Sequence, residues 1–329
     1  MFLIGQEDLK IYGWKSYLPF QEGRYVTQSE DKIFYATEAA IVSVEKQTRA
    51  PEFFSKVDGL SEVGISLIKY SPFADVMLVA YNSSIIDLVK EEGIRSFNDI
   101  PENRNISGDK SILDITYENE RWAYIATAFG VIQFDTEREE FGFTVRMNLR
   151  VNALTINDNK IYAGTEEGVY FAPLDQNLNL GDFSQWTFLG ANVGLPDFYE
   201  CRAIGSFNGK VYLDRDGMLY AVEGNNSRFI YQEDDKDINY ISAEGKDLLV
   251  GFGNNTSNGK VYFFDTEERR SDSGNLCSNQ PLFAIQDQFD QVWYADVFRN
   301  FRVAPRSGLD CEAINFNSPR FASLSEINV

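Results

Sequence analysis

Short apolar runs alternate with polar turns along this chain, and one arrangement of them returns seven times. Each occurrence consists of an apolar run, a small residue, a polar turn and a second apolar run. The runs are rich in Val, Ile, Tyr and Phe, which favours β-strands. The seven first runs are Lys32–Thr37, Val76–Tyr81, Trp122–Thr127, Lys160–Thr165, Lys210–Asp214, Asp247–Phe252 and Gln291–Asp296. The pattern therefore predicts an all-β chain built from pairs of neighbouring strands.

The spacing of these units predicts how they are arranged. The first runs end 38 to 49 residues apart, and a period of roughly 40–45 residues of short strands is typical of propeller blades. A single unit cannot bury its own apolar face, so the units must stack around an axis. We therefore expect one seven-bladed β-propeller with four-stranded antiparallel blades, although 329 residues is long for a single ordinary core.

The two ends of the chain bear on how the ring closes. Only three strands are evident after Pro281, so we expect residues 11–18 to add an N-terminal strand to the last blade and close the ring. The propeller then covers residues 8–317. Residues 1–7 are interpreted as the remnant of a secretory signal peptide or as an unstructured start. Residues 318–329 are interpreted as a connector towards a following domain.

The composition excludes several classes of function. The chain contains no histidine, which removes Ser-His-Asp catalysis, Cys-His catalysis and His-ligated metal sites. Hydrolysis by a pair of carboxylates stays open because it needs only Asp and Glu, but no pair stands out among the 50 acidic residues. We therefore assign no catalytic residue, no cofactor and no metal ligand, and we expect a protein that is not an enzyme.

The net charge of −20 at pH 7 narrows the choice of partners. An acidic chain lacks the basic face that phosphate groups require, so nucleic acid and anionic lipid are disfavoured. A solvated surface is the plain interpretation of the charge. The alternative is calcium at the acidic loops Asp214–Gly217 and Glu233–Asp237, although neither has the complete ligand series of a calcium loop. The sequence holds no run of about 18 apolar residues, so we expect no membrane span.

The three cysteines differ in their surroundings. Cys201 lies in an apolar, strand-like stretch and is expected to be a free, buried thiol. Cys277 and Cys311 fall in polar loops on either side of the seventh unit, so a disulfide between them would tie both ends of the last blade. That pairing requires an exported protein, and in a reducing cytoplasm the two would be independent loop thiols.

Two long polar segments are candidates for contact with a partner. They are Asn98–Asp109 and Leu174–Trp186. Because the strand faces are committed to blade packing, recognition must use loops and the two ends of the ring. In the second segment, Phe183 and Trp186 are candidate anchors for a sugar or a protein partner. The alternative for both aromatic residues is the packed core of the loop itself.

Two sets of motifs resemble known propeller families. The stretches Asp58-Gly59-Leu60-Ser61 and Tyr162-Ala163-Gly164-Thr165 are similar to the repeat of periplasmic two-component-regulator propellers. A second set, taken in its order, resembles the amino-terminal propeller of the PorZ-like accessory proteins of type IX secretion. Its pieces are Trp14–Pro19, Lys32–Thr37, Lys56–Ser61, Ala80–Leu88 and Ile106–Lys110, and the likeness continues to the segment Asn315–Arg320.

The second resemblance implies a non-enzymatic scaffold in the periplasm or on the outer surface of a Bacteroidetes-type cell. In that family the propeller precedes a second propeller and a sorting domain. It works in an attachment complex beside the sortase-like protease that links cargo to anionic lipopolysaccharide. The implied partners are other secretion-complex proteins and a cell-surface glycan or lipopolysaccharide. The first resemblance implies the alternative of a periplasmic sensor propeller in a hybrid two-component histidine kinase, and a glycan-active enzyme is the third interpretation.

Overall fold

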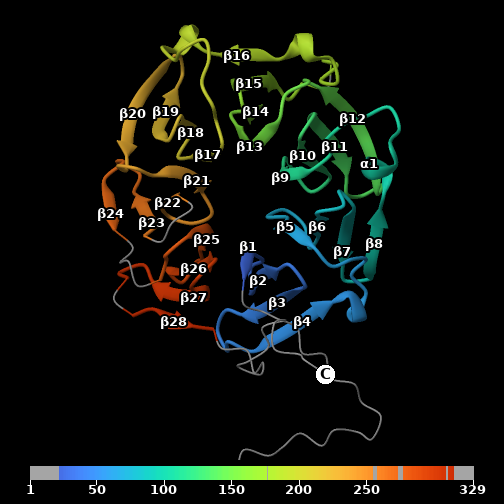
Figure 1. Cartoon of the computed structure of the whole chain (residues 1–329), viewed down its shortest axis with the longest axis vertical. Helices are drawn as coiled ribbons and strands as arrows, with labels where there is room; N and C mark the ends of the chain where they lie inside the picture. Colours follow the sequence, from blue (N-terminus) through green and yellow to red (C-terminus); the bar gives the residue numbers. More distant parts are fainter. Residues whose placement is uncertain (1–21, 176, 255–257, 273–276, 309, 315–329) are drawn as a thin grey trace, which may run out of the picture.

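Seven four-stranded sheets surround a common axis in the computed structural model of this chain (Figure 1). The structure describes residues 22–175, 177–254, 258–272, 277–308 and 310–314. Within each sheet, neighbouring strands pair antiparallel and follow one another in chain order, and the first strand lies nearest the axis. The predicted fold class is confirmed, because this is a seven-bladed β-propeller of four-stranded blades.

The strand bounds follow the blades in order. The first three blades contain β1 (Gly23–Gln28), β2 (Lys32–Thr37), β3 (Ala40–Glu45) and β4 (Pro51–Ser55); β5 (Ile65–Tyr70), β6 (Met77–Tyr81), β7 (Ile86–Lys90) and β8 (Gly93–Phe97); and β9 (Ile112–Tyr117), β10 (Trp122–Thr127), β11 (Gly130–Asp135) and β12 (Glu140–Arg146). The fourth and fifth contain β13 (Val151–Asn157), β14 (Lys160–Thr165), β15 (Gly168–Pro173) and β16 (Thr187–Leu189); and β17 (Ile204–Phe207), β18 (Lys210–Arg215), β19 (Met218–Glu223) and β20 (Asn226–Gln232). The last two contain β21 (Asp237–Ser242), β22 (Leu248–Gly253), β23 (Lys260–Phe264) and β24 (Arg270–Asp272); and β25 (Pro281–Gln286), β26 (Gln291–Asp296), β27 (Asn300–Pro305) and β28 (Glu312–Ala313). Single helical turns lie in the connections: η1 (Lys56–Asp58), α1 (Asp99–Glu102), η2 (Phe183–Gln185) and η3 (Ala191–Val193).

The repeated sequence unit corresponds to the second and third strands of each blade. Its small residue and polar turn recur because a buried side chain closes the tight turn between these strands. Thr127 Oγ1 donates to the carbonyl oxygen of Gly130 at 2.8 Å, and Thr37 and Thr165 make the same contact in their own blades. In the last blade, Asp296 Oδ1 accepts the turn's backbone N–H from Phe298 instead. A side chain that satisfies the turn's backbone groups is the usual chemistry of such positions.

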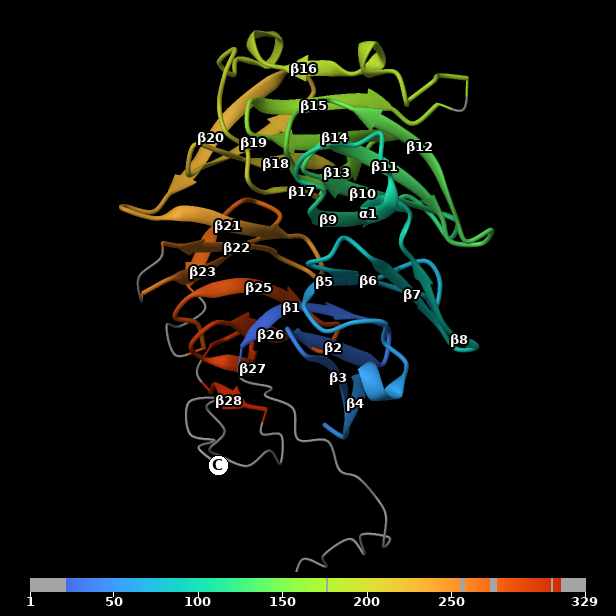
Figure 2. The same cartoon turned by 45° about the vertical axis from the view of Figure 1, so that its right-hand side comes forward.

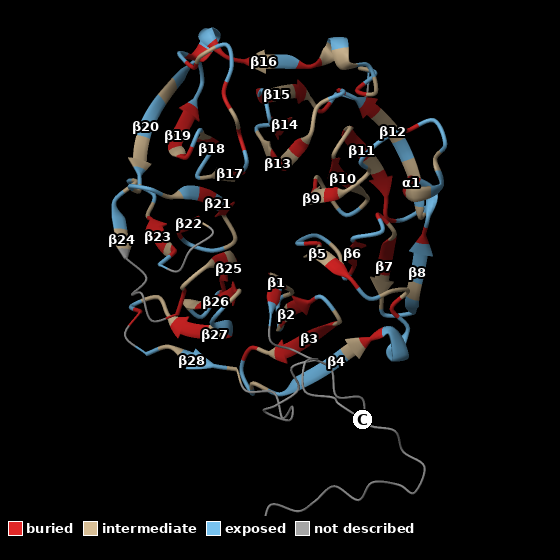
Figure 3. Cartoon of the chain, viewed as in Figure 1, coloured by how far each residue is buried: buried red, intermediate tan, exposed pale blue. Residues whose placement is uncertain are grey.

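Buried apolar side chains fill the space between neighbouring blades. Figure 3 marks the buried residues along the strands of the blades. At the junction of the first and last blades, the rings of Tyr35 and Phe301 stack with centroids 4.2 Å apart, and Trp293 lies 5.6 Å from Phe301. All three side chains are fully buried. Figure 2 shows the blades as sheets stacked against one another around the ring. The core is therefore divided among the blade interfaces, which explains how one domain of this length is stabilised.

The expected number of strands in the last blade needs correction. Four strands after Cys277, not three, build the last blade, because the two-residue strand β28 occupies its outer edge. That strand was missed because it is so short and is exposed. Residues 11–18 lie outside the described residues, so their expected strand stays a prediction. In the described part of the chain, the ring closes through contacts between β1 and β25. The Gln28 side-chain amide donates to the Gln286 carbonyl oxygen at 3.1 Å, and the rings of Tyr25 and Phe283 stack 4.1 Å apart.

The cysteines take the arrangement described above for an exported protein. Cys277 and Cys311 form a disulfide with Cα atoms 5.5 Å apart, and the bridge joins the segment before β25 to the residue before β28. Cys201 is free and fully buried at the junction of the fourth and fifth blades. Burial raises the pKa of its thiol well above the ordinary value. Cys201 is therefore a packing residue and not a reactive thiol.

Candidate functional site: the axial cavity and the two ring faces

A cavity of about 680 Å³ occupies the axis of the ring. Residues of β1, β5, β9, β13, β17, β21 and β25, the innermost strand of every blade, contribute to its lining. The outer-facing edges of these strands are paired within the blades, so their inner edges present backbone N–H and C=O groups to the cavity. The volume lies in the range of small-molecule sites.

An ion pair crosses this cavity between blades that are not neighbours. Lys69, in β5 of the second blade, places its Nζ 2.6 Å from Glu244 Oε1, just after β21 of the sixth blade. Both side chains are largely buried, with 18% and 27% of their surface exposed. The two residues are 175 positions apart in sequence. No local pattern in the sequence marks them, so this pair could not be predicted before the fold was known.

Further charged and aromatic groups surround the ion pair. The Phe283 ring lies 5.7 Å from Lys69 Nζ, and Tyr25 stacks on Phe283. Burial would lower the pKa of Lys69, but Glu244, Tyr25 and Asp114 outweigh burial and raise it, so the side chain carries a positive charge. Burial raises the pKa of Asp114 to about 6, against the opposing effects of Lys69 and of two backbone N–H donors.

Side-chain hydrogen bonds link each inner strand, or the residues beside it, to the next around the axis. The contacts, all 2.8–3.2 Å long, are Tyr70 N to Thr27 Oγ1, Tyr117 Oη to the Lys69 carbonyl, Leu154 N to Asp114 Oδ2, Asn152 Nδ2 to the Cys201 carbonyl, Arg202 Nη1 to Asp237 Oδ2, Asn239 Nδ2 to the Pro281 carbonyl, and Gln28 Nε2 to the Gln286 carbonyl. Every blade junction has at least one such link. The inner wall of the cavity is thus fixed around its whole circumference.

The ring has two faces that carry different connections. On the entry face, where each inner strand begins, lie the second turn of each blade and the connections between blades. On the exit face, where each inner strand ends, lie the first and third turns. Backbone hydrogen bonds join the connections of each face, such as Ala128 N to Ser111 O on the entry face and Thr136 N to Arg121 O on the exit face. By this topology Asn98–Asp109 is on the entry face and Leu174–Trp186 on the exit face, so the two candidate segments do not form one surface.

Phe183 and Trp186, the candidate anchors in the second segment, pack against other residues of the chain. Trp186 is only 7% exposed, and its Nε1 donates to the carbonyl oxygen of Leu180 at 3.0 Å. Phe183 is half-buried, with its ring 5.1 Å from that of Tyr170. The structure thus favours the alternative stated above, in which both side chains form the core of the loop. Their place in a partner contact has no support in this geometry.

Other aromatic residues are exposed at the ring faces. Phe198, in the connection from β16 to β17, is 67% exposed, and Phe298, in the turn from β26 to β27, is 57% exposed. Both belong to the entry face. Phe73 and Phe289 are about half exposed and belong to the exit face. Large apolar side chains that remain in contact with water are candidates for a protein contact.

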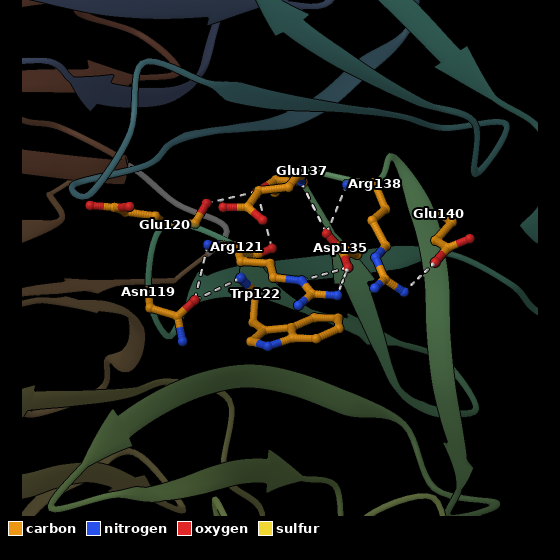
Figure 4. Close-up of polar contacts among 9 residues, drawn as sticks. Asn119, Glu120, Arg121, Trp122, Asp135, Glu137, Arg138 and Glu140 are labelled. Atoms are coloured by element: carbon orange, nitrogen blue, oxygen red, sulfur yellow. Dashed lines mark hydrogen bonds and ion pairs between the residues drawn. The ribbon is translucent and has the colours of Figure 1, made fainter. Parts of the chain in front are cut away.

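A polar cluster on the exit face joins two turns of the third blade (Figure 4). The Arg121 guanidinium lies over the Trp122 ring, 4.4 Å from its centroid, and donates to Asp135 Oδ2 from Nε at 2.7 Å. Asp135 Oδ1 accepts the backbone N–H groups of Glu137 and Arg138. Burial would raise the pKa of Asp135, but these donors outweigh burial and lower it. All the groups have partners within the blade, so the cluster stabilises the turns.

The acidic loops do not gather a metal site in the part of the chain that the structure describes, since no group of three or more acidic or cysteine ligands converges there. The carboxylate of Asp214 accepts backbone N–H groups from Gly217 and Arg202, and Asp216 accepts one from Glu200. Glu233 binds Lys260 Nζ at 2.6 Å. These oxygens already have protein donors. Nor is any helix among the described residues long and apolar enough to cross a membrane.

Comparison with known proteins finds a family match for part of this chain and shared folds among solved structures. Residues 33–187, just under half of the chain, match the family described as the N-terminal β-propeller domain of PorZ from the type IX secretion system. Among solved structures, PorZ of Porphyromonas gingivalis, an essential bacterial surface component of that system, matches with a TM-score of 0.78 and 18% identity. The alignment covers 93% of this chain and 40% of the PorZ chain. No curated protein matches in sequence.

Two further structures share the fold. The extracellular domain of a protein described as a hybrid two-component system, from B. thetaiotaomicron, matches with a TM-score of 0.64 and 15% identity, over 88% of this chain and 41% of that one. Hydrazine synthase of Kuenenia stuttgartiensis matches with a TM-score of 0.65 and 13% identity, over 90% of this chain and 99% of that one. The chain thus spans about two fifths of the length of the first two proteins. The resemblance predicted from the sequence is therefore confirmed: residues 33–187 match the PorZ N-terminal propeller family, and the seven blades have the fold seen in PorZ.

Proposed function

We propose that this chain is a non-enzymatic scaffold propeller of a type IX secretion attachment complex, located in the periplasm or on the outer cell surface. The observation that carries the proposal is the family match over residues 33–187, joined to the propeller fold of a PorZ structure. The absence of histidine from the sequence supports a role without catalysis. The Cys277–Cys311 disulfide supports export, because such bonds persist in oxidising compartments.

We further propose that partners bind at the ring faces and not at the blade sides. Other proteins of the secretion complex fit the exposed aromatic residues of the entry face, Phe198 and Phe298, better than the packed pair Phe183 and Trp186. A cell-surface glycan or lipopolysaccharide is the other class of partner that the resemblance implies. The whole propeller spans residues 8–317 in this proposal.

The test uses the bacterium that encodes the chain. Its gene is disrupted and then complemented with the wild type or with variants, and the fraction of secreted cargo that stays attached to the cell surface is measured. Disruption is expected to release cargo, and the wild type to restore attachment. The double variant Phe198→Ser and Phe298→Ser is expected not to restore attachment of cargo. The matched variant Phe53→Ser and Phe229→Ser, on outer strands β4 and β20, should restore it. Normal attachment in the disrupted strain would refute the scaffold role.

The sensor function is the second candidate, and the structural match to the two-component extracellular domain favours it. A sensor would leave cargo attachment intact in the disrupted strain. It would instead change the transcriptional response to an external ligand such as a glycan. The same strain therefore separates the two candidates, with RNA sequencing in the presence and absence of glycan as the second readout.

A further inference from the structure

The end of the Lys69 side chain is surrounded by the kinds of group that recognise ammonium ions. Glu244 Oε1 lies 2.6 Å from Nζ, and the Phe283 ring lies 5.7 Å from it, backed by the stacked Tyr25. The Asp114 carboxylate also attracts the ammonium group electrostatically. A carboxylate combined with aromatic faces is a common recognition arrangement for ammonium ions.

The groups that surround this ammonium come from blades other than that of Lys69. Tyr25 belongs to the first blade, Asp114 to the third, Glu244 to the sixth and Phe283 to the seventh. Contacts that do not involve Lys69 hold them in place. The backbone carbonyl of Glu244 accepts the Gln286 N–H at 3.0 Å, and Asp114 accepts the N–H of Leu154 at 2.8 Å. The surroundings are therefore assembled by the ring, and the lysine side chain is inserted into them from the second blade.

We propose that the axial cavity holds a binding site for a primary ammonium group, formed by Glu244, Asp114, Tyr25 and Phe283, and that Lys69 fills this site as a tethered guest in the ligand-free chain. The site goes beyond the proposed partner contacts at the ring faces. A ligand that carries an ammonium group competes with Lys69 and displaces it.

The size and charge of the cavity define the class of ligand. A volume of about 680 Å³ suits a small molecule or the end of a flexible peptide, and it excludes a folded domain. Glu244 pairs with the Lys69 ammonium group and Asp114 lines the same cavity, so acidic groups remain in the site when Lys69 leaves it. The net charge of −20 draws cations towards the protein from a distance. The ligand is therefore a small primary amine or a peptide with an accessible lysine.

The experiment removes the Lys69 side chain from the full chain and supplies a soluble amine in its place. n-Butylammonium has the length and charge of a lysine side chain, and its binding is measured by calorimetry at constant ionic strength. Lys69→Ala is expected to bind it about tenfold to a hundredfold more tightly than the wild type, the range of one charge-assisted hydrogen bond. Adding Glu244→Gln to Lys69→Ala should remove that gain. The matched control Lys246→Ala, which removes a lysine from an exposed ion pair with Asp290, should behave as the wild type.

Binding of three further compounds shows whether the site requires a charge and whether it accepts a lysine within a peptide. Butan-1-ol has the same shape without the charge and is expected not to bind. Acetyl-Gly-Gly-Lys-amide, compared with its norleucine analogue, shows whether a peptide lysine enters the site as a small amine does. If folded Lys69→Ala binds n-butylammonium no better than Lys246→Ala does, or binds it independently of Glu244, the proposal is wrong. If Lys69→Ala does not fold alone, rescue of folding by n-butylammonium and not by butan-1-ol supports the site, and the absence of rescue overturns it.

Discussion

The ammonium group of Lys46, in the first blade, lies 2.8 Å from the side-chain oxygen of Gln288 in the last blade. The lysine is only 6% exposed, and its remaining contacts are the carbonyl oxygens of Ser29 and Glu30 at 2.6 and 3.0 Å. Burial lowers the pKa of Lys46 despite nearby acidic groups. One side chain thus ties together two turns of the first blade and the first turn of the seventh.

Replacing Lys46 by Met should destabilise the ring where the first and last blades meet. The change leaves three oxygen acceptors without their shared donor, and we expect a loss of about 1–3 kcal/mol in the free energy of unfolding. Urea unfolding followed by tryptophan fluorescence measures it. Lys246→Met is the matched control, because Lys246 is 66% exposed in its ion pair with Asp290 and such pairs contribute at most about 1 kcal/mol. Equal losses in both variants would show that the buried lysine has no special role.

Reduction of the Cys277–Cys311 disulfide should weaken the last blade. The bridge closes a loop with a sequence separation of 34, which corresponds to roughly 3–4 kcal/mol in the chain-entropy account. The free energy of unfolding is compared with and without dithiothreitol. In the double variant Cys277→Ser and Cys311→Ser, dithiothreitol should have no further effect. A wild type that is equally stable in both conditions would contradict the prediction.

Asp214 should make stability depend on pH. Burial raises its pKa to about 7, although its carboxylate accepts the N–H groups of Gly217 and Arg202. The folded chain therefore holds this proton more tightly than the unfolded chain, so the contribution is full below the ordinary pKa near 3.9 and is lost as pH rises through about 7. Asp214→Asn, which stays neutral, should lose less stability relative to the wild type at pH 8 than at pH 5, by on the order of 1–3 kcal/mol.

Asp214 is not the only carboxyl group whose shifted pKa makes stability depend on pH. Burial and neighbouring donors shift other carboxyl groups in both directions: the pKa of Asp114 is raised to about 6, and that of Glu233 is lowered to about 2 by Lys260, Tyr231 and Tyr262 despite its burial. Asp214→Asn should therefore remove only part of the dependence between pH 5 and 8. A variant whose stability difference from the wild type is constant over this range would show that Asp214 titrates normally.

Trp186→Ala should lower the stability of the fold. We do not expect it to weaken partner binding selectively. The indole packs against the third and fourth blades and donates to the Leu180 carbonyl oxygen, so its removal is expected to cost about 2–4 kcal/mol. Differential scanning calorimetry of the isolated chain measures the change. Phe183→Ala, at a half-buried position, should cost less. A Trp186→Ala variant as stable as the wild type would return this residue to the list of contact candidates.

The sequence predicts the parts of this fold that are local. The second and third strands of every blade were visible because their apolar runs recur in a repeated frame, with Thr37, Thr127 and Thr165 making the same turn contact in three blades. The blade number follows from the spacing of these runs. β28 was missed because two exposed residues, Glu312 and Ala313, carry no periodicity. The Lys69–Glu244 pair was missed because neither residue has a neighbour in sequence that signals it, and only the closed ring brings β5 and β21 to the same axis.

The closure of the ring also has a consequence for the order of folding. Within a blade, each strand pairs with the next along the chain, so its hydrogen bonds form between close segments. The bond from Gln28 to Gln286 joins residues 258 positions apart and requires the other blades to be in place. Contacts with large sequence separation form slowly because closing long loops costs chain entropy. The seam between β1 and β25 should therefore be the last part of the protein to form, and the place where an arrested or newly synthesised chain exposes its strand edges to other chains.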